Sequence, residues 1–163
     1  MNKSPFLQSI ESFMRMRRYS RRTISTYLYW IKYFILYNNK QHPEQLGDLD
    51  IERFLTFLVV ERNVSASTQK IALNAIVFLK TKFLKQDVGH LGTFAKSRRQ
   101  PKLPVVLTKN EVAKLLAKTT GSKKLMLSIL YGSGLRRIEL LRLRVKDVDF
   151  DLCQLQVWNG KGG

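Results

Sequence analysis

A run of arginines between residues 15 and 22 is the densest group of chemically distinctive side chains in the sequence. It places five arginines within eight residues, among hydroxyl and aromatic side chains: Arg15, Arg17, Arg18, Arg21 and Arg22. Guanidinium groups bind phosphate oxygens in pairs, and nearby hydroxyl and helix N-terminal N–H groups fix the register. A solvated charged face would contain the same residues, but their density favours a phosphate-binding surface.

The net charge of the chain supports the same interpretation. Lys and Arg total 29 against 12 Asp and Glu, which gives a formal net charge of +17 over 163 residues. An excess of this size predicts a polyanionic partner. Positive charge gathers again after Asp87, in a stretch without acidic residues that holds Lys96, Arg98, Arg99 and Lys102.

Arg136 lies in a more specific setting. Gly132-Ser-Gly134 precedes it, and glycines there end a helix and permit close approach of the backbone. The neighbouring residues are mostly apolar, so the guanidinium is only partly solvated, and Glu139 follows three residues later on the same helical face. On spacing alone, Arg136 and Glu139 also fit an ordinary ion pair of a helix.

The elements that must position these residues begin with four predicted helices. Between Pro5 and Lys85, apolar residues recur four times with a helical period. Short connections between the helices suit an antiparallel bundle. The expected N-caps are Ser20 or Thr23 for the second helix, Asp48 or Asp50 for the third, and Ser65 or Ser67 for the fourth.

Glycines and prolines between Gln86 and Val106 interrupt the helical period and predict a linker. Beyond it, Thr108-Lys-Asn-Glu111 has the spacing of a capping box and opens a helix. Two more helices are expected at about 123–131 and 136–143. Residues 152–158 alternate apolar and polar side chains, which predicts a half-buried strand without a hairpin partner, and Asn159-Gly160 predicts a turn.

Several classes of protein are disfavoured by the same sequence. Its apolar runs, such as Leu55 to Val60, are shorter than the roughly 18 residues of a membrane span. The N-terminus lacks the apolar core and cleavage site of a secretory signal. One cysteine excludes an internal disulfide framework, and two distant histidines argue against a zinc site. We therefore expect a soluble intracellular protein.

The second half of the chain resembles the tyrosine recombinases, also called phage-type integrases. The likeness rests on Gly134-Leu-Arg-x-x-Glu139-Leu, then Leu143-Arg-Val-Lys-Asp-Val-Asp149, and finally Gly160-Lys-Gly-Gly163. The basic helical domain, the basic linker and Leu103-Pro-Val-Val-Leu-Thr-x-x-Glu111 match the family as well, so the resemblance covers the whole chain. Within the family, the sequence is most similar to the integron integrases, from Tyr131 onward.

The resemblance implies a mainly α fold. Residues 1–92 would form a four-helix SAM-like core-binding domain, 93–103 a basic linker, and 104–163 the first helices and strand of an α+β catalytic domain. The implied partner is double-stranded DNA at recombination sites, bound by the arginine cluster and the basic linker. The resemblance implies no metal and no cofactor. Whole members of the family act as tetramers on DNA, here in the bacterial cytoplasm at the nucleoid.

The resemblance also assigns roles to three residues. Arg136 matches the first catalytic arginine, which binds the nonbridging oxygens of the scissile phosphate. Lys161 matches the lysine that protonates the leaving 5′-oxygen, and Glu139 matches a supporting acidic residue. The family's His-x-x-Arg motif and nucleophilic tyrosine have no counterpart in this sequence. We therefore expect an N-terminal fragment that binds DNA as part of a site-specific recombinase and has no catalytic activity by itself.

Two other functions are compatible with the sequence. A naturally truncated DNA-binding protein could occupy recombination sites and compete with an intact integrase. A basic helical RNA-binding protein is the second alternative, and the motifs around Arg136 and Lys161 count against it.

Overall fold

The computed structural model describes residues 4–89, 91–92, 94–98 and 103–158. The chain divides into two compact units, residues 1–102 and 103–163, which we call the helical unit and the C-terminal unit. Each is described by itself. Among the described residues, no helix combines the length and the apolar character that crossing a membrane requires.

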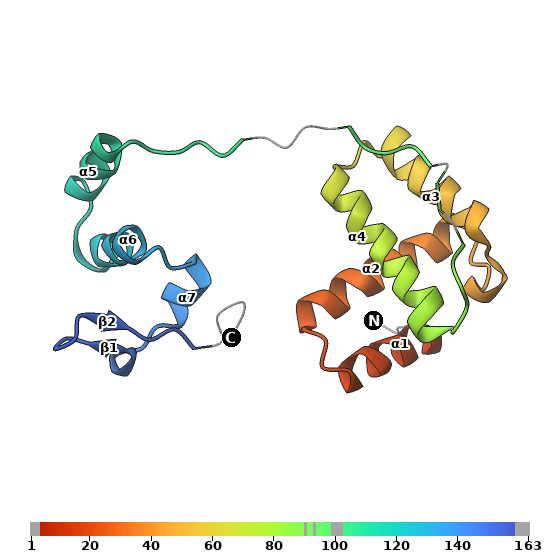
Figure 1. The fold of residues 1–163 in the computed structure, drawn as a ribbon, viewed down its shortest axis with the longest axis horizontal. Coiled ribbons are helices and arrows are strands. Elements are labelled where there is room, and N and C mark those ends of the chain that lie inside the picture. Colours follow the sequence, from red (N-terminus) through yellow and green to blue (C-terminus); the bar gives the residue numbers. More distant parts are fainter. Residues whose placement is uncertain (1–3, 90, 93, 99–102, 159–163) are drawn as a thin grey trace. The chain divides into compact units, whose positions relative to one another are not determined.

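The helical unit contains the four helices that the sequence predicts (Figure 1). Their apolar faces meet in one core that includes Met14, Ile31, Phe54 and Ile76. The fourth helix ends differently from the prediction, because its last turns, from Phe78 to Phe83, have π-helical hydrogen bonding. The elements are α1 (Pro5–Met16), α2 (Arg21–Tyr37), a 3₁₀ turn η1 (Pro43–Gln45), α3 (Asp48–Val60), α4 (Ala66–Val77) and the π-helical turn η2 (Phe78–Phe83).

Side-chain caps fix where two of these helices begin. The hydroxyl of Ser20 accepts a hydrogen bond from the N–H of Thr23 at 3.1 Å, and Ser65 caps α4 in the same way. The start of α3 differs from the prediction, because its N-cap is Gly47 rather than an aspartate. The carboxylate of Asp50, inside the helix, accepts the N–H of Gly47 at 2.9 Å.

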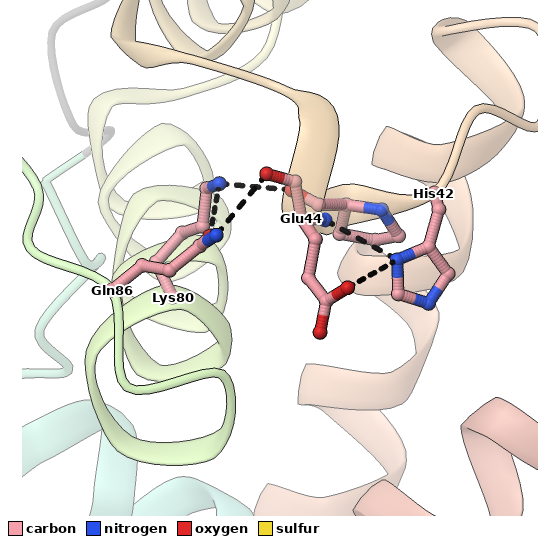
Figure 2. Close-up of polar contacts among 5 residues, drawn as sticks. His42, Glu44, Lys80 and Gln86 are labelled. Carbon is pink, nitrogen blue, oxygen red and sulfur yellow. Dashed lines mark hydrogen bonds and ion pairs between the residues drawn. The ribbon is translucent and has the colours of Figure 1, made fainter.

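A buried lysine in η2 is hydrogen-bonded to two other segments of the helical unit. Only 4% of Lys80 is exposed, and its ammonium donates to the carbonyl of Pro43 at 2.8 Å and to the side-chain oxygen of Gln86 at 2.7 Å. Gln86 in turn donates to the carbonyl of Glu44 at 3.1 Å, as Figure 2 shows. Burial lowers the pKa of the Lys80 ammonium below its ordinary value, although nearby carboxylates oppose the shift. This network fixes the point where the chain leaves η2.

The described residues between Gln86 and Arg98 run along α3, and we call them the return segment (Figure 1). Acceptors spaced four residues apart share one face of a helix, and α3 uses three of them to hold backbone N–H groups of this segment. Residues 94–98 of the predicted linker therefore pack against the helices of this unit. The three bonds run from Gly89 to Asp48 (3.0 Å), from Gly92 to Glu52 (3.1 Å) and from Ala95 to Thr56 (3.2 Å).

The C-terminal unit begins with the predicted capping box. The hydroxyl of Thr108 accepts the N–H of Glu111 at 3.3 Å, and the Glu111 carboxylate accepts the N–H of Thr108 at 2.8 Å. Gly134 ends α6 in the left-handed region, with φ of 66°, which a glycine adopts without steric cost. The elements are α5 (Lys109–Ala117), α6 (Gly121–Ser133), α7 (Arg137–Arg142), a 3₁₀ turn η3 (Val145–Asp147), β1 (Val148–Asp149) and β2 (Gln154–Leu155).

The strand in this unit is shorter than predicted, and it has a partner. β2 pairs antiparallel with β1, and Val148 lies opposite Leu155. Leu152 belongs to the connecting turn, where the Asp149 carboxylate accepts its N–H at 2.8 Å. The expectation of an unpaired strand over 152–158 was therefore wrong for the described residues. The predicted turn at Asn159-Gly160 lies outside them.

Candidate nucleic-acid interface and phosphate site

The arginine cluster spans the connection between α1 and α2. Arg15 forms an ion pair with Glu11, with Nη2 and Oε1 2.7 Å apart. The guanidinium of Arg17 lies over the ring of Phe13, 3.7 Å from its centroid, which is a cation–π contact. Both arginines stay exposed. Their neighbours thus orient two of the cluster's cations before any ligand binds.

The other three arginines occupy positions that cost the free protein stability. Arg18 has a φ of 58°, in the left-handed region that residues other than glycine rarely adopt. Arg21 and Arg22 form the first turn of α2, and no acidic residue shares that turn. The positive end of the helix dipole repels cations, whereas a bound anion would reverse this repulsion. The arrangement favours an anionic ligand at the start of α2.

A shallow groove of about 340 Å³ lies between the first turns of α2 and the outer face of α4. Hydroxyl, amide and guanidinium groups of the kind that line it bind phosphates and base edges of nucleic acids. The sequence analysis missed Thr26 and Asn74 because it followed the apolar faces, and the polar face opposite them holds the signal. The lining residues are Ser20, Arg22, Thr23, Thr26, Tyr27, Ile71 and Asn74.

The basic residues predicted for the linker divide into two groups. Lys96 and Arg98 are exposed on the return segment, whereas Arg99 and Lys102 lie outside the described residues. Between the first two, Ser97 donates its hydroxyl to the carbonyl of Val64 at 2.8 Å, directly before α4. Lys96 and Arg98 therefore belong to the same unit as the arginine cluster.

Arg136 is the N-cap of α7, and Glu139 holds it from inside the helix. Nη1 of Arg136 lies 2.7 Å from Oε1 of Glu139, and the other carboxylate oxygen accepts the N–H of Arg136 at 2.8 Å. These two bonds, the backbone one foremost, lower the pKa of Glu139. The Arg136 side chain is 60% exposed, against 13% for Glu139. The cation thus faces solvent while its partner is covered.

Arg136 lines a cleft of about 530 Å³. Three arginines line this cleft together with two carboxylates, and both carboxylates already bind arginine. Three arginines against two carboxylates leave an excess of positive charge in this partly enclosed site, which suits a phosphate group. The lining residues are Arg136, Ile138, Glu139, Arg142, Leu143, Arg144, Asp147, Gln156, Val157 and Trp158.

Asp147 closes the cleft on the side of the hairpin, and only 4% of it is exposed. Its carboxylate accepts from Nε and Nη2 of Arg144, at 3.0 and 3.1 Å, and from the indole N–H of Trp158 at 3.0 Å. The side-chain bonds from Arg144 are the main cause of the lowered pKa of Asp147. The sequence analysis gave Asp147 no role, although Arg144-x-x-Asp147 repeats the spacing of Arg136-x-x-Glu139.

Lys161, the predicted general acid, lies outside the described residues. Among the described residues, no group of three or more acidic, histidine or cysteine side chains could hold a metal ion.

Most tyrosines of the helical unit pack their rings edge-on against phenylalanines, and the ring centroids of Tyr27 and Phe78 lie 5.4 Å apart. Tyr29 and Tyr131 are exposed.

Comparison with known proteins relates both units to one family. Residues 6–90 match the phage integrase N-terminal SAM-like domain, and residues 105–163 match the phage integrase family. An Escherichia coli protein named integrase/recombinase is 40% identical over 156 residues, which cover 96% of this chain and 46% of that protein. The tyrosine recombinase XerA of Pyrococcus horikoshii is 31% identical over 162 residues, covering 98% of this chain and 54% of XerA.

One solved structure is also similar to this chain. The chain in the crystal structure of XerA recombinase is 31% identical to this chain, and the two superpose with a TM-score of 0.48. The match covers 97% of this chain and 56% of the XerA chain. The chain spans about half the length of the relatives that it matches. The special likeness to integron integrases stays a prediction. The matches to both family models, over residues 6–90 and 105–163, show that this chain belongs to the phage integrase family of tyrosine recombinases.

Proposed function

We propose that the chain is the DNA-binding portion of a site-specific recombinase of the integron type, which acts in DNA integration and recombination. The observation that carries the proposal is the pair of arginines in the first turn of α2. No acidic residue shares that turn, and Arg22 lines the groove between α2 and α4. Phosphates of duplex DNA supply the missing negative charge, and the groove meets the sugar–phosphate backbone and the base edges.

In this proposal Arg136 binds the nonbridging oxygens of the scissile phosphate. Glu139 holds the arginine through backbone and side chain, so its charge is oriented before the substrate arrives. Preorganised charge stabilises the additional negative charge of the pentacoordinate transition state. Lys161 protonates the leaving 5′-oxygen as the general acid. Arg142 and Arg144, which line the same cleft, add positive potential around the phosphate.

The 163 residues alone are proposed to bind DNA without cutting it. Covalent catalysis needs a nucleophile, and neither histidine of the sequence begins a His-x-x-Arg motif that would accompany it. The proposed partner is double-stranded DNA at recombination sites in the bacterial cytoplasm. The complete recombinase is proposed to assemble there as a tetramer.

Salt-dependent binding tests the proposal. The chain is titrated onto a labelled DNA duplex at several salt concentrations, and log K should fall against log[salt] with a slope of about −0.9 for each phosphate contacted. Replacing Arg17, Arg18 and Arg21 with alanine should flatten this slope. The matched control is Lys40→Asn, a charge removed beyond the other end of α2, where Asn tolerates the left-handed backbone.

Two results would contradict the proposed binding to DNA. One is an affinity for DNA that does not change with salt. The other is tighter binding to an RNA duplex of the same sequence, which would favour the RNA-binding alternative. A covalent protein–DNA adduct formed by these 163 residues would contradict the statement that they do not cut DNA.

A further inference from the structure

Gln69 on α4 is a buried polar residue that the proposed function does not use. Only 5% of it is exposed. Its side-chain N–H groups donate to the carbonyl of Leu55 at 3.1 Å and to that of Ala95 at 2.7 Å, and its oxygen accepts the N–H of Ser97 at 3.1 Å. A buried amide costs free energy unless it is hydrogen-bonded, and both ends of this amide are. Gln69 thus binds the return segment to two helices.

The hydrogen bonds to Ala95 and Ser97 determine which side chains of the return segment face the helices and which face solvent. Ala95 and Ser97 direct their hydrogen-bonding groups toward α3 and α4, where Thr56 accepts the N–H of Ala95 at 3.2 Å and Gln69 binds both residues. Both are half-buried, whereas Lys96 between them and Arg98 after them are exposed. The backbone is therefore held by the unit, and the two cationic side chains are left for solvent or for a ligand.

The return segment lies beside the start of α4. The hydroxyl of Ser97 is bonded to Val64, directly before the Ser65 cap of α4. The first turns of that helix expose Ser67 and Lys70. The return segment therefore adds its two cations at the start of α4, the helix whose outer face lines the groove shared with α2.

We propose that Gln69 is a positioning residue that holds Lys96 and Arg98 as a fixed contact to the phosphate backbone of duplex DNA. The inference rests on the proposed DNA binding and adds a second contact surface to the arginine cluster. Side chains on a loose linker must be ordered when they bind, and that loss of freedom weakens association. When the backbone of the segment is already bonded to α3 and α4, the backbone part of that cost is avoided.

A mutant cycle tests the coupling. In the wild-type chain, Lys96→Ala with Arg98→Ala removes two phosphate contacts, so the slope of log K against log[salt] becomes shallower by about 1.8. Between 50 and 200 mM salt, the wild type then loses about twelvefold more affinity than this double variant. In a Gln69→Leu background the segment is released, and the same two substitutions should change the slope by less than half as much.

Controls separate release of the segment from general destabilisation. Ile76→Val trims a buried core residue of the same helix and removes none of the hydrogen bonds from Gln69, Thr56 and Val64 to the segment, so it should leave the effect of Lys96 and Arg98 unchanged. Thr56→Val keeps the side-chain shape, removes the acceptor for Ala95, and should act like Gln69→Leu. Hydrogen exchange of the Ala95 and Ser97 amides should be more than tenfold faster than in the wild type in both segment variants, and unchanged in Ile76→Val.

The outcomes distinguish the two proposals. If the wild-type chain does not bind duplex DNA, the proposed function fails. If it binds with the expected salt dependence but Lys96 and Arg98 contribute nothing, the positioning role of Gln69 is wrong. The same holds if their contribution is undiminished in the Gln69→Leu and Thr56→Val chains.

Discussion

The carboxylate of Glu139 binds Arg136 twice, through the backbone N–H at 2.8 Å and through the guanidinium at 2.7 Å. The first bond caps α7, and the second sets the direction of the arginine. One acidic side chain therefore fixes both the start of the helix and the cation that the helix presents. The same geometry recurs eight residues later, where Asp147 binds the N–H and the guanidinium of Arg144.

The first prediction concerns the titration of Glu139. The backbone N–H of Arg136 is the largest cause of its lowered pKa and the guanidinium bond comes second, so Arg136→Ala should restore only part of the shift. Carboxyl NMR resonances followed against pH measure the midpoint in both chains. A return of the pKa in Arg136→Ala to the ordinary value of 4.5 would contradict this order of causes.

The direction of the shift fixes the pH dependence of α7. A lowered pKa in the folded state means that Glu139 contributes stability above pH 4.5, and that this contribution is lost as pH falls through the lowered pKa. Glu139→Gln should accordingly fray α7 at neutral pH and match the wild type in acid. Exchange rates of the α7 amides check both halves of this statement.

The second prediction is that Arg21 and Arg22 lower the stability of the free chain and strengthen its binding to DNA. Arg21→Gln and Arg22→Gln keep a similar helix propensity and remove cations from the positive end of the helix dipole. Each should stabilise the free chain by about 0.3–1 kcal/mol and should weaken DNA binding. Urea unfolding and DNA titration are measured on the same samples.

The matched control for α2 is Lys32→Gln, a cation farther along the helix and away from its first turn. It should leave the unfolding free energy nearly unchanged, because the dipole effect fades beyond the first turn. If the arginine variants lose stability as well as affinity, the two residues serve the fold rather than a ligand.

The third prediction follows from the burial of Lys80. Lys80→Met removes the donor to the buried Pro43 carbonyl and should cost about 1–3 kcal/mol, the penalty for an unsatisfied buried group. Because burial lowers the pKa of Lys80 in the folded state, the unfolded chain binds more protons between that value and 10.5. The advantage of the wild type over Lys80→Met should therefore grow as pH rises through this range.

Urea unfolding of both chains from pH 7 to pH 10 measures that difference. Lys82→Met, on an exposed residue of the same turn, controls for the loss of one positive charge. A wild-type advantage that shrinks with rising pH would mean that attraction by the nearby carboxylates, and not burial, sets the pKa of Lys80.

Local patterns predicted the features that depend on neighbouring residues. Ser20, Ser65 and Thr108 cap helices as expected, because a cap needs only a hydroxyl and the backbone N–H three residues later. Gly134 ends α6 for an equally local reason, since glycine adopts the left-handed region freely. The pairing of Arg136 with Glu139 belongs to the same class.

Features that join distant segments left no such pattern. Gln69 and Ala95 are 26 residues apart in sequence, and Lys80 and Pro43 are 37 apart. A lone Gln or Lys on an otherwise apolar helix face does not reveal which carbonyl it will meet. For this reason the residues from Gln86 to Val106 were predicted as a linker from their glycines and prolines, although α3 binds the N–H groups of Gly89 and Gly92.

The last prediction divides the chemistry between Arg136 and Lys161 and uses a chain joined to a segment that carries a His-x-x-Arg motif and a nucleophilic tyrosine. If Lys161 protonates the leaving 5′-oxygen, Lys161→Ala should slow cleavage by about 10²–10⁴-fold, the range for a general acid. A substrate with sulfur at the leaving position needs little protonation because a thiolate leaves readily, so it should restore most of the rate. Arg136→Ala should not be rescued, since its proposed partners are the nonbridging oxygens, which the sulfur does not alter. Equal rescue of both variants, or of neither, would show that the two residues do not divide the work in this way.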